Sequence, residues 1–533
     1  MISDISLENR KSNFLTETII TSTSTGFEDD ECIQLPINNI NRFEHELSVF
    51  DSFLLYKKAV FWCIVVSLTI VMDGYDGALV SGFYAQPAFQ KYYGELLHDG
   101  TYSISAAWQT ALGMGSPVGR VIGGLGVGYF ASKFGRKYTL IGALIMIIGI
   151  LFIVFFATSI GMLCAGLILS GILWGVFNTL APTYASEVCP LQLRGILTAY
   201  INLAWVIGQF INMGVMNGFV NVKSQWAYRI PFGIQWIWPV MILCVLPFAP
   251  ESPWWLVRKD RVSDARQSLK RLTSFNNTDQ LEKYLNTIVK TDKEARKIDN
   301  SITWSDCFRE TDLRRTEIAC MVWSCQALCG NPMFGYVAYF FEMAGISETN
   351  AFKIALGLTA VGFIGNIISW FLTFRFGRRA NYLGGLILMA LVMFFIGILD
   401  IPRKNNNSTK YAWGQSIFFF VFAFIYDLTI GPVAFIIVSE IPSVRLREKT
   451  IALATTAYSL WGVVFQIAVP YMLNPQKANW SGKTCFVFFV LGILTLVWTY
   501  FRLPETANRT YSEIDRLFKL NLPARKFKGY KFF

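Results

Sequence analysis

Long apolar runs dominate this sequence and limit what the chain can fold into. A membrane-spanning helix needs about 20 consecutive apolar residues, because the hydrocarbon core of a bilayer is about 30 Å thick. We expect twelve such helices, near Ala59–Val80, Ile104–Phe130, Thr139–Ala157, Met162–Leu180, Ile196–Met216, Phe232–Phe248, Ile318–Phe341, Ile354–Phe374, Tyr382–Leu399, Trp413–Val438, Ile451–Leu473 and Cys485–Leu503. The runs predict an all-α membrane protein embedded in a lipid bilayer.

Charged residues are few and lie mainly outside these runs. Asp, Glu, Lys and Arg make up 16% of the chain, where soluble domains carry about 25%. The net charge is +11, but Lys and Arg are spread over short connections instead of gathering on one folded surface. We therefore expect no nucleic-acid partner.

The basic residues favour one set of connections, which predicts the orientation of the chain. They follow the second, fourth, eighth and tenth runs, at Lys133, Arg136, Lys137, Arg194, Arg375, Arg378, Arg379, Arg445, Arg447 and Lys449. The opposite connections are poorer in basic residues, although Arg403, Lys404 and Lys410 are an exception. Because cytoplasmic loops carry an excess of Lys and Arg, both termini are predicted to be cytoplasmic.

Composition divides the chain into five segments. Residues 1–58 are polar, rich in Ser, Thr and Asn, and predict a disordered cytoplasmic tail that is not a signal peptide. Residues 59–248 form a first six-helix bundle and residues 318–503 a second one. A charged cytoplasmic linker, 249–317, joins the bundles, and residues 504–533 form a cytoplasmic C-terminal tail.

An internal repeat relates the two bundles. Phe134-Gly135-Arg136-Lys137 after the second run matches Phe376-Gly377-Arg378-Arg379 after the eighth run. Ser186-Glu187, followed by Leu193-Arg194, matches Ser439-Glu440, followed by Leu446-Arg447. Pro250-Glu251-Ser252 matches Pro504-Glu505-Thr506. Three matches in the same order predict two pseudo-symmetric halves with a binding site between them.

These motifs resemble the sugar porters of the major facilitator superfamily, and more narrowly the fungal α-glucoside (maltose-type) permeases. The general traits are Gly74-Tyr75-Asp76 and Tyr184-Ala185-Ser186-Glu187. The narrower traits are Trp226–Phe232 with Gln235-Trp236, and Pro250–Arg258. The resemblance covers residues 57–518. It implies the twelve-helix major facilitator fold, in two six-helix halves.

The resemblance also implies a function. We expect a monomeric plasma-membrane transporter that imports an α-glucoside such as maltose, sucrose or trehalose together with protons, by alternating access. A proton-independent sugar facilitator is an alternative. A non-transporting sugar sensor is another, although such sensors tend to have a long cytoplasmic tail and the segment after Glu513 is short.

The sequence gives no sign of an enzyme or of a cofactor. Its histidines are His45 and His98, and most of its ten cysteines lie inside apolar runs, where they behave as small apolar residues. Gly123–Gly128 superficially resembles a dinucleotide loop, but no βαβ unit surrounds it, so close helix packing is the better interpretation. We expect no metal, no cofactor and no catalytic activity.

Two carboxylates in the first run are candidates for proton coupling. Asp73 and Asp76 are three positions apart, on roughly one face of a helix, and a charge inside a spanning helix is costly enough to need a reason. We expect Asp76 to border a central cavity and to carry the proton. An ion pair that only stabilises helix packing is the structural alternative.

Arg120 in the second run is expected to pair with Asp76 or Asp73 and to lower its proton affinity. The alternative is that Arg120 extends to the membrane interface. The α-glucoside permeases usually have Glu at this position and Arg at the position of Thr455, and many sugar porters have Arg at the position of Leu167. These departures favour the facilitator alternative.

Sugar recognition needs amide and hydroxyl groups together with aromatic faces. The candidates inside the apolar runs are Asn202, Trp205, Gln209, Gln326, Asn331, Tyr336, Tyr458 and Trp461. Hydrogen bonds between helices, or packing for the aromatic residues, are the alternative roles. Asp427 also lies inside a run, and the sequence suggests no partner for it.

The repeated motifs resemble the cytoplasmic charge network of the family. Its members here are Gly135, Arg136, Lys137, Glu187, Arg194, Arg378, Glu440 and Arg447. Such ion pairs would hold the outward-open state and break as the inside opens. The alternative is that these charges only fix the topology.

Overall fold

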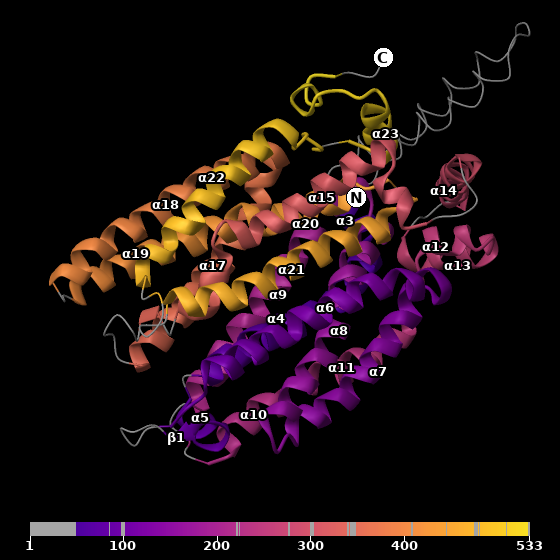
Figure 1. Ribbon diagram of the computed structural model, residues 1–533. Helices are drawn as coiled ribbons and strands as arrows, with labels where there is room; N and C mark the ends of the chain where they lie inside the picture. Colours follow the sequence, from indigo (N-terminus) through magenta and orange to yellow (C-terminus); the bar gives the residue numbers. More distant parts are fainter. Residues whose placement is uncertain are drawn as a thin grey trace, which may run out of the picture. The chain divides into compact units, whose positions relative to one another are not determined.

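Long helices form nearly all of the regular structure in the computed structural model (Figure 1). The structure describes residues 49–84, 86–96, 102–219, 222, 224–274, 278–298, 303–337, 340–341, 348–406, 409–443, 445–473, 478, 480–507 and 509–530. Residues 1–48 of the predicted N-terminal tail lie outside this part. One compact unit covers Leu47–Phe533.

The first bundle runs from α4 to α11 in chain order. Its elements, with the short helix before them, are α3 (Val49–Leu55), α4 (Lys57–Phe83), α5 (Pro87–Tyr93), β1 (Glu95–Leu96), β2 (Tyr102–Ser103), α6 (Ala106–Phe134), α7 (Arg136–Phe155), α8 (Ile160–Val188), α9 (Leu191–Phe219), α10 (Trp226–Ile234), α11 (Ile237–Val245) and η1 (Leu246–Phe248). The strands β1 and β2 form a short antiparallel pair in the connection between α5 and α6.

The linker and the second bundle follow. The linker contains α12 (Pro253–Arg258), α13 (Val262–Leu272), α14 (Thr278–Ile298) and η2 (Ser305–Phe308). The second bundle contains α15 (Glu310–Leu328), η3 (Asn331–Tyr336), α17 (Glu348–Phe376), α18 (Arg378–Asn406), α19 (Thr409–Leu428), α20 (Ile430–Glu440), α21 (Arg447–Leu473), η4 (Ser481–Lys483) and α22 (Thr484–Arg502). The C-terminal segment carries α23 (Tyr511–Lys519) and η5 (Ala524–Lys526).

Each predicted span falls on one helix or on two consecutive helices. Three spans predicted as continuous are divided, into α10 and α11, α15 and η3, and α19 and α20. Among the described residues, ten helices are long and apolar enough to cross a membrane. The other two spans, α6 and α15, are more polar, because α6 is rich in Gly and carries Arg120, and the first turn of α15 carries Glu310 and Asp312.

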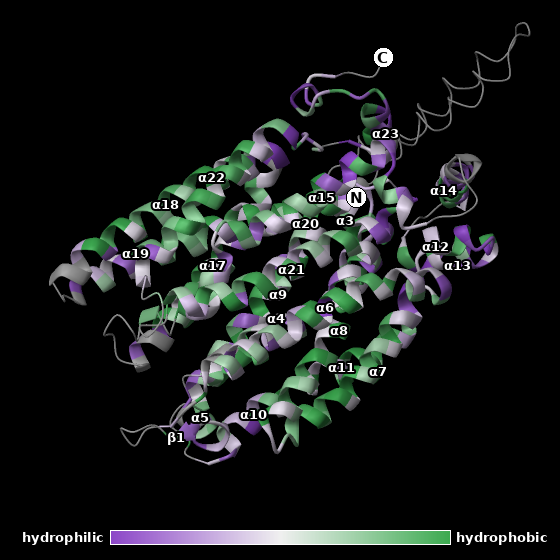
Figure 2. Ribbon diagram, viewed as in Figure 1, coloured by the Kyte–Doolittle hydropathy of each residue, from purple (hydrophilic) through white to green (hydrophobic). Residues whose placement is uncertain are grey.

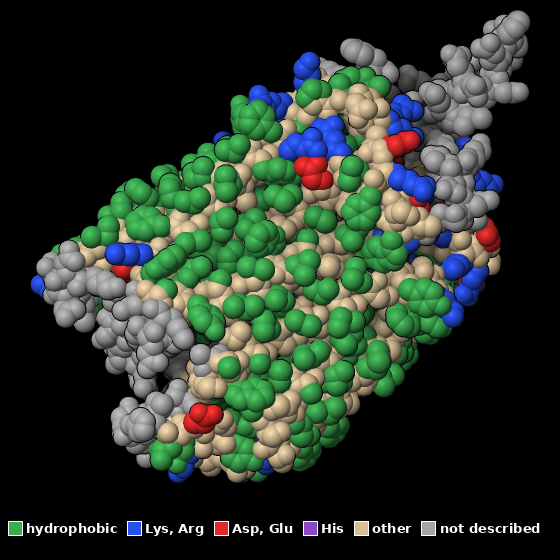
Figure 3. All heavy atoms as spheres, in the orientation of Figure 1, with side chains coloured by type: hydrophobic (Ala, Val, Ile, Leu, Met, Phe, Trp, Pro, Cys, Tyr) green, Lys and Arg blue, Asp and Glu red, His purple; other side chains and the backbone are tan. Residues whose placement is uncertain are grey.

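Hydropathy separates the sides of the bundles from their ends. Apolar residues cover the long helices, whereas polar residues dominate α13 and parts of α14 and α23 (Figure 2). On the face shown in Figure 3, apolar side chains fill the middle, and most Lys and Arg side chains gather at the end that carries α12–α14 and α23. We call this end the linker end. The distribution is that of a protein with an apolar band facing lipid.

Small residues allow close packing inside the first bundle. A Cβ atom at Gly123 of α6 would overlap the carbonyl oxygen of Ile172 on α8, and a Cβ atom at Gly208 of α9 would overlap that of Val71 on α4. Small residues let membrane helices approach backbone to backbone, where dispersion and weak hydrogen bonds hold them. Gly123 belongs to the Gly123–Gly128 segment that was predicted to serve close helix packing, and it lies at the interface between α6 and α8.

Two related pairs of helices make the most extensive contacts between the bundles. The helix α6 packs on α21, and the helix α9 packs on α17. The internal repeat relates the two pairs to each other, because α6 corresponds to α17 and α9 corresponds to α21. The fold is therefore the predicted one of two pseudo-symmetric six-helix halves, and the space between α4, α6, α8 and α9 on one side and α15, α19, α20 and α21 on the other is where a site can form.

The close contact at Gly123 predicts a stability difference between two similar substitutions. Gly123→Ala places a methyl group against the backbone of α8 and should destabilise the fold by about 1–3 kcal/mol. Gly126→Ala is the matched control, because a Cβ atom at Gly126 meets no atom within 4 Å. We expect the apparent Tm in detergent, measured by fluorescence-detected size-exclusion chromatography, to fall for Gly123→Ala and to hold or rise for Gly126→Ala. Equal Tm values would contradict the packing interpretation.

Candidate functional site

A cavity of about 430 Å³ lies between the two bundles. The first bundle contributes Asp73, Arg120, Asn178, Asn202 and Trp205, and the second contributes Trp323, Gln326, Tyr426, Phe435, Thr455, Tyr458 and Ser459. Aromatic faces combined with amide and hydroxyl groups suit a small polar molecule with an apolar side.

An ion pair lies at the wall of this cavity. Nη2 of Arg120 on α6 is 2.5 Å from Oδ1 of Asp73 on α4, and the amide Nδ2 of Asn178 on α8 donates to Oδ2 of Asp73 at 2.8 Å. Both carboxylate oxygens of Asp73 thus have a donor. Of the two partners predicted for Arg120, the structure pairs it with Asp73.

Asp76 has a different environment. It is 4% exposed, and its carboxylate accepts hydrogen bonds from Nε1 of Trp174 and Nε2 of Gln235, both at 2.7 Å. Asp76 does not belong to the residues that line the cavity, in contrast to our expectation. The physical reason is that positions three apart on a helix differ by about 60° in direction, which turns Asp76 towards α8 and the junction of α10 and α11.

Four of the eight predicted sugar-binding residues line the cavity, namely Asn202, Trp205, Gln326 and Tyr458. The other four, which are Gln209, Asn331, Tyr336 and Trp461, are not among its lining residues. Asn331 donates to the hydroxyl of Tyr426 at 3.3 Å, Tyr336 donates to Oε1 of Gln466 at 2.5 Å, and Trp461 stacks on Phe465 with ring centroids 5.8 Å apart. The binding roles of all eight stay predictions.

Sequence reasoning missed other lining residues, among them Asn178, Trp323, Tyr426, Phe435 and Ser459. Each lies within an apolar run, where an aromatic or small polar residue has the same sequence context as one that only packs. The available signal for Trp323 was its place three positions before Gln326, which puts the two on roughly the same face of the seventh span.

The two bundles also meet through Asp427, for which the sequence suggested no partner. The amide Nδ2 of Asn202 on α9 donates to Oδ1 of Asp427 on α19 at 3.1 Å. Gly362 on α17 leaves the room for this carboxylate, because a Cβ atom there would overlap Oδ2 of Asp427. Asp427 lies just before the break between α19 and α20, so this contact links the first bundle to a break in the second.

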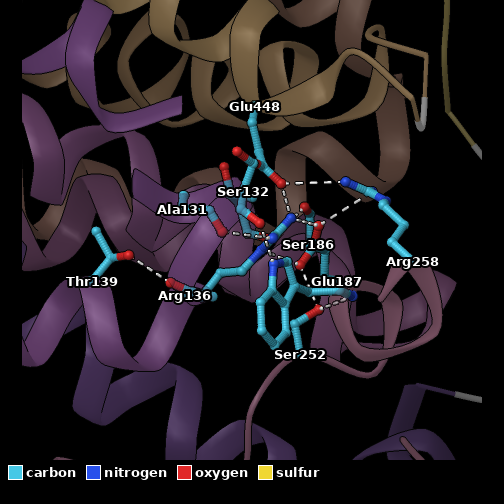
Figure 4. Close-up of polar contacts among 12 residues, drawn as sticks. Ala131, Ser132, Arg136, Thr139, Ser186, Glu187, Ser252, Arg258 and Glu448 are labelled. Atoms are coloured by element: carbon cyan, nitrogen blue, oxygen red, sulfur yellow. Dashed lines mark hydrogen bonds and ion pairs between the residues drawn. The ribbon is translucent and has the colours of Figure 1, made fainter. Parts of the chain in front are cut away.

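A charge network lies at the linker end of the first bundle (Figure 4). The guanidinium of Arg136 donates to both carboxylate oxygens of Glu187, at 2.8 and 3.0 Å, and the hydroxyl of Ser252 donates to Oε2 of Glu187 at 2.5 Å. Such two-point contacts between Arg and a carboxylate are stronger than neutral hydrogen bonds. The network therefore joins α7, α8 and the start of the linker.

Glu448 on α21 extends this network across the bundles. It forms ion pairs with Arg136 and with Arg258 of α12, the latter at 3.3 Å. Burial lowers the pKa of Arg258 to about 10, so its guanidinium stays charged at neutral pH. Figure 4 shows Glu448 facing Arg136 and Arg258 from the opposite side of the network from Ser252. The bundles are thus held together at the linker end.

The second bundle repeats the network. Arg378 pairs with Glu440 at 3.1 Å, and the hydroxyl of Thr506 donates to Oε2 of Glu440 at 2.6 Å. These residues occupy the repeat positions of Arg136, Glu187 and Ser252. The correspondence that was predicted from motifs alone therefore extends to individual side-chain contacts.

A carboxylate also covers the start of a helix in each half. Glu251 accepts from the backbone N–H groups of Arg136 and Lys137, at 3.0 and 3.1 Å. Glu505 accepts from those of Arg378 and Arg379, at 2.9 and 3.1 Å. Negative charge at a helix N-terminus satisfies free N–H groups and complements the helix dipole. Burial raises the pKa of Glu251, since the charged form loses solvation.

Glycine is required at the turn that presents these N–H groups. Gly135 and Gly377 have φ of 92° and 83°, a region that side chains rarely adopt. A Cβ atom at Gly377 would also come within 2.6 Å of Glu505 Oε2. Gly135 thus has a structural role in the predicted gate.

The remaining gate predictions have separate contacts. Nζ of Lys137 donates to the carbonyl of Pro247 at 2.5 Å, and the guanidinium of Arg447 lies 3.8 Å from the ring centroid of Tyr511 on α23. The side chain of Arg194 lies outside the described residues. Glu448 was not predicted to belong to the gate. Its repeat position in the first half is occupied by Gly195, so the comparison of the two halves gave no charged counterpart.

Comparisons with known proteins agree with this geometry. The sequence model of the family described as sugar (and other) transporter matches residues 62–518. The maltose permease MAL31 of Saccharomyces cerevisiae is 40% identical over 513 residues, covering 94% of this chain and 82% of that protein. A general alpha-glucoside permease of Saccharomyces cerevisiae is 40% identical over 496 residues, covering 92% of this chain and 80% of that protein.

Solved structures show the same fold. A structure of the proton:xylose symporter XylE bound to 6-bromo-6-deoxy-D-glucose matches with a TM-score of 0.73 at 21% identity, covering 87% of this chain and 99% of that chain. A partially occluded inward-open structure of the xylose transporter XylE from E. coli matches with a TM-score of 0.68 at 19% identity, covering 85% of this chain and 99% of that one.

The contacts of Glu448 predict that its neutralisation opens the linker end. Contacts between charged groups contribute about 1.5–3 kcal/mol, so the population open at this end should rise by about tenfold or more in Glu448→Gln. The measurement is the distance distribution between spin labels at Tyr138 on α7 and Arg375 on α17, both exposed.

Glu317→Gln is the matched control for this measurement. Glu317 is bonded to Arg502 and Trp498 inside the second bundle, so the same change of charge breaks no contact between the bundles. Longer distances are expected for Glu448→Gln alone. Identical distributions in both variants and the unmodified protein would show that Glu448 does not hold the bundles together.

Proposed function

The chain belongs to the sugar transporter family, and we propose that it imports an α-glucoside such as maltose, sucrose or trehalose together with protons. It is a multi-pass transporter of the major facilitator fold and not an enzyme. The proposed location is the plasma membrane, with both termini and the linker end in the cytoplasm, because the short connections at that end carry the excess of Lys and Arg.

The cavity between the bundles is the observation that carries the proposal. Both halves line it, and its wall offers amides, hydroxyls and aromatic faces, the groups that bind sugar hydroxyls and the apolar side of a pyranose ring. The curated relatives are named as maltose and alpha-glucoside permeases. We therefore place an α-glucoside in this cavity.

Alternating access is proposed to depend on the contacts that close the cytoplasmic side of the cavity. Glu448 with Arg136 and Arg258 closes the cytoplasmic side, and these ion pairs must break before sugar can leave inwards. Two rigid bundles that rock about a central site need few contacts that break and re-form. The network is therefore a cytoplasmic gate in this proposal.

Asp76 is the proposed proton carrier. Its two hydrogen-bond donors, Trp174 and Gln235, are neutral, whereas Asp73 already has a cation at hydrogen-bond distance. A carboxylate inside the membrane without a cation of its own is a suitable site for a proton that is loaded on one side and released on the other.

A proton-independent facilitator is the second candidate. The observation that favours it is the Asp73–Arg120 ion pair, because the carboxylate that borders the cavity is neutralised by a fixed cation and needs no proton for that purpose. The two candidates differ in whether sugar addition moves protons, which can be measured directly.

The proposal predicts coupled movement of sugar and protons. Yeast cells that lack their own transporters and express this chain should take up radiolabelled maltose, sucrose or trehalose faster at acidic than at neutral external pH. Sugar addition should also make an unbuffered suspension more alkaline. Uptake that does not depend on pH, without alkalinisation, would instead support the facilitator.

Asp76→Asn tests the proposed carrier. The substitution keeps the shape of the side chain and removes its titration, so concentrative uptake should be lost while exchange of labelled for unlabelled sugar continues. Asp427→Asn is the matched control, since it neutralises a different buried carboxylate within the spanning helices, one that accepts a hydrogen bond from Asn202. If Asp427→Asn lost accumulation and Asp76→Asn kept it, our assignment of the proton to Asp76 would be wrong.

A further inference from the structure

Three buried N–H donors at the cavity have no acceptor within the described part of the chain. They are Nε of Arg120, the indole Nε1 of Trp323 and the amide Nε2 of Gln326. All three residues line the cavity, with Arg120 on the first bundle and the other two on the second. A buried donor without an acceptor costs free energy, so each of these groups is available to bind an acceptor of a ligand.

The orientation of Arg120 is fixed by its neighbours. Asp73 binds Nη2, and Asn178 in turn holds the second carboxylate oxygen of Asp73. The guanidinium is planar and has five N–H donors in a rigid arrangement, and the ion pair uses one nitrogen. Asp73 is therefore a positioning residue for Arg120, which keeps further donors for the cavity.

The orientation of the Gln326 amide follows from a chain of hydrogen bonds. Nδ2 of Asn331 donates to the hydroxyl oxygen of Tyr426 at 3.3 Å, and that hydroxyl donates its own hydrogen to Oε1 of Gln326 at 2.8 Å. Because Asn331 supplies a donor, Tyr426 has its hydrogen free for the oxygen of Gln326. The NH2 group of Gln326 is the end of this chain that has no acceptor.

Aromatic contacts hold Trp323 in place. Its ring meets Phe435 and Tyr458 edge to face, with centroids 4.8 and 5.5 Å apart, and both of these residues also line the cavity. Edge-to-face contacts fix the plane of the indole. Its N–H group is thus held at the cavity together with the aromatic faces.

We propose that Arg120, Trp323 and Gln326 form a donor subsite that binds acceptor oxygens of the sugar from both bundles at once. This inference deepens the proposed function and depends on it. The subsite makes Arg120 a sugar-contacting residue, and not only the partner of a proton-coupling carboxylate. Because its free groups are donors, it selects ligand groups that can accept a hydrogen bond, and it disfavours a protonated amino group, which can only donate.

The first test removes one donor and keeps an aromatic ring at the same position. Trp323→Phe keeps an aromatic ring and removes the N–H group, so KM for the transported sugar should rise by about threefold to tenfold, with little change in the maximal rate. Trp62→Phe is the matched control, because Trp62 contacts Phe61 edge to face, is not among the lining residues and is not one of the predicted sugar-binding residues. Arg120→Lys keeps the charge but loses the planar donor arrangement, and should raise KM by about tenfold.

The second test changes the sugar. At acidic pH, uptake is inhibited with analogues of the transported sugar in which one hydroxyl at a time is replaced by hydrogen, fluorine or an amino group. Fluorine keeps a weak acceptor and the protonated amino group keeps only donors. At the position that Trp323 or Arg120 binds, inhibition should decrease from hydroxyl to fluoro to deoxy to amino, and this order should disappear in the variant that lacks the donor.

Failure of the subsite and failure of the proposed function give different results in these experiments. Unchanged KM values in both Trp323→Phe and Arg120→Lys, or analogues that inhibit equally whether they donate or accept, would overturn the subsite while leaving sugar transport intact. If the unmodified protein takes up none of maltose, sucrose, trehalose and glucose, the proposed function fails and the subsite fails with it.

Discussion

The cost of placing charge and unpaired polar groups inside a lipid bilayer controls this structure. Asp73 and Arg120 are tolerated within spanning helices because each satisfies the other, and Asn178 completes the carboxylate. The same cost explains why polar groups line the space between the bundles, whereas apolar side chains cover the middle of the outer face shown in Figure 3. A polar cavity at mid-bundle is therefore possible only because two apolar-faced halves enclose it.

The duplication of the chain supplies that enclosure and a matched set of ion pairs at one end. Arg136 with Glu187 and Arg378 with Glu440 perform the same local task, which is to join two helices of one bundle. Glu448 departs from the symmetry, since the other half has Gly195 at its position, and Glu448 reaches across the bundles to Arg136. Symmetry thus builds the two bundles, and a residue outside the symmetry connects them at the linker end, where the proposed transport cycle requires them to separate.

The sequence predicted the fold well because hydropathy and the repeat are both long-range regularities. Twelve spans, two halves and the paired charge motifs all follow from them. The divided helices were not predicted, since α19 and α20 read as one apolar run across Thr429. The cavity was predicted in part, because the direction of a side chain depends on how neighbouring helices rotate: Asp73, and not Asp76, borders it, and Trp323 looked the same as a packing residue.

The central claim is that a sugar binds between the two bundles, with Trp205 on one side and Trp323 on the other. A cryo-electron microscopy structure of the protein in lipid nanodiscs with maltose tests this most directly. The account predicts density for one sugar molecule in the cavity, within hydrogen-bond distance of Arg120 and Gln326. Density for the sugar at a different place, with this cavity occupied by side chains alone, would contradict it.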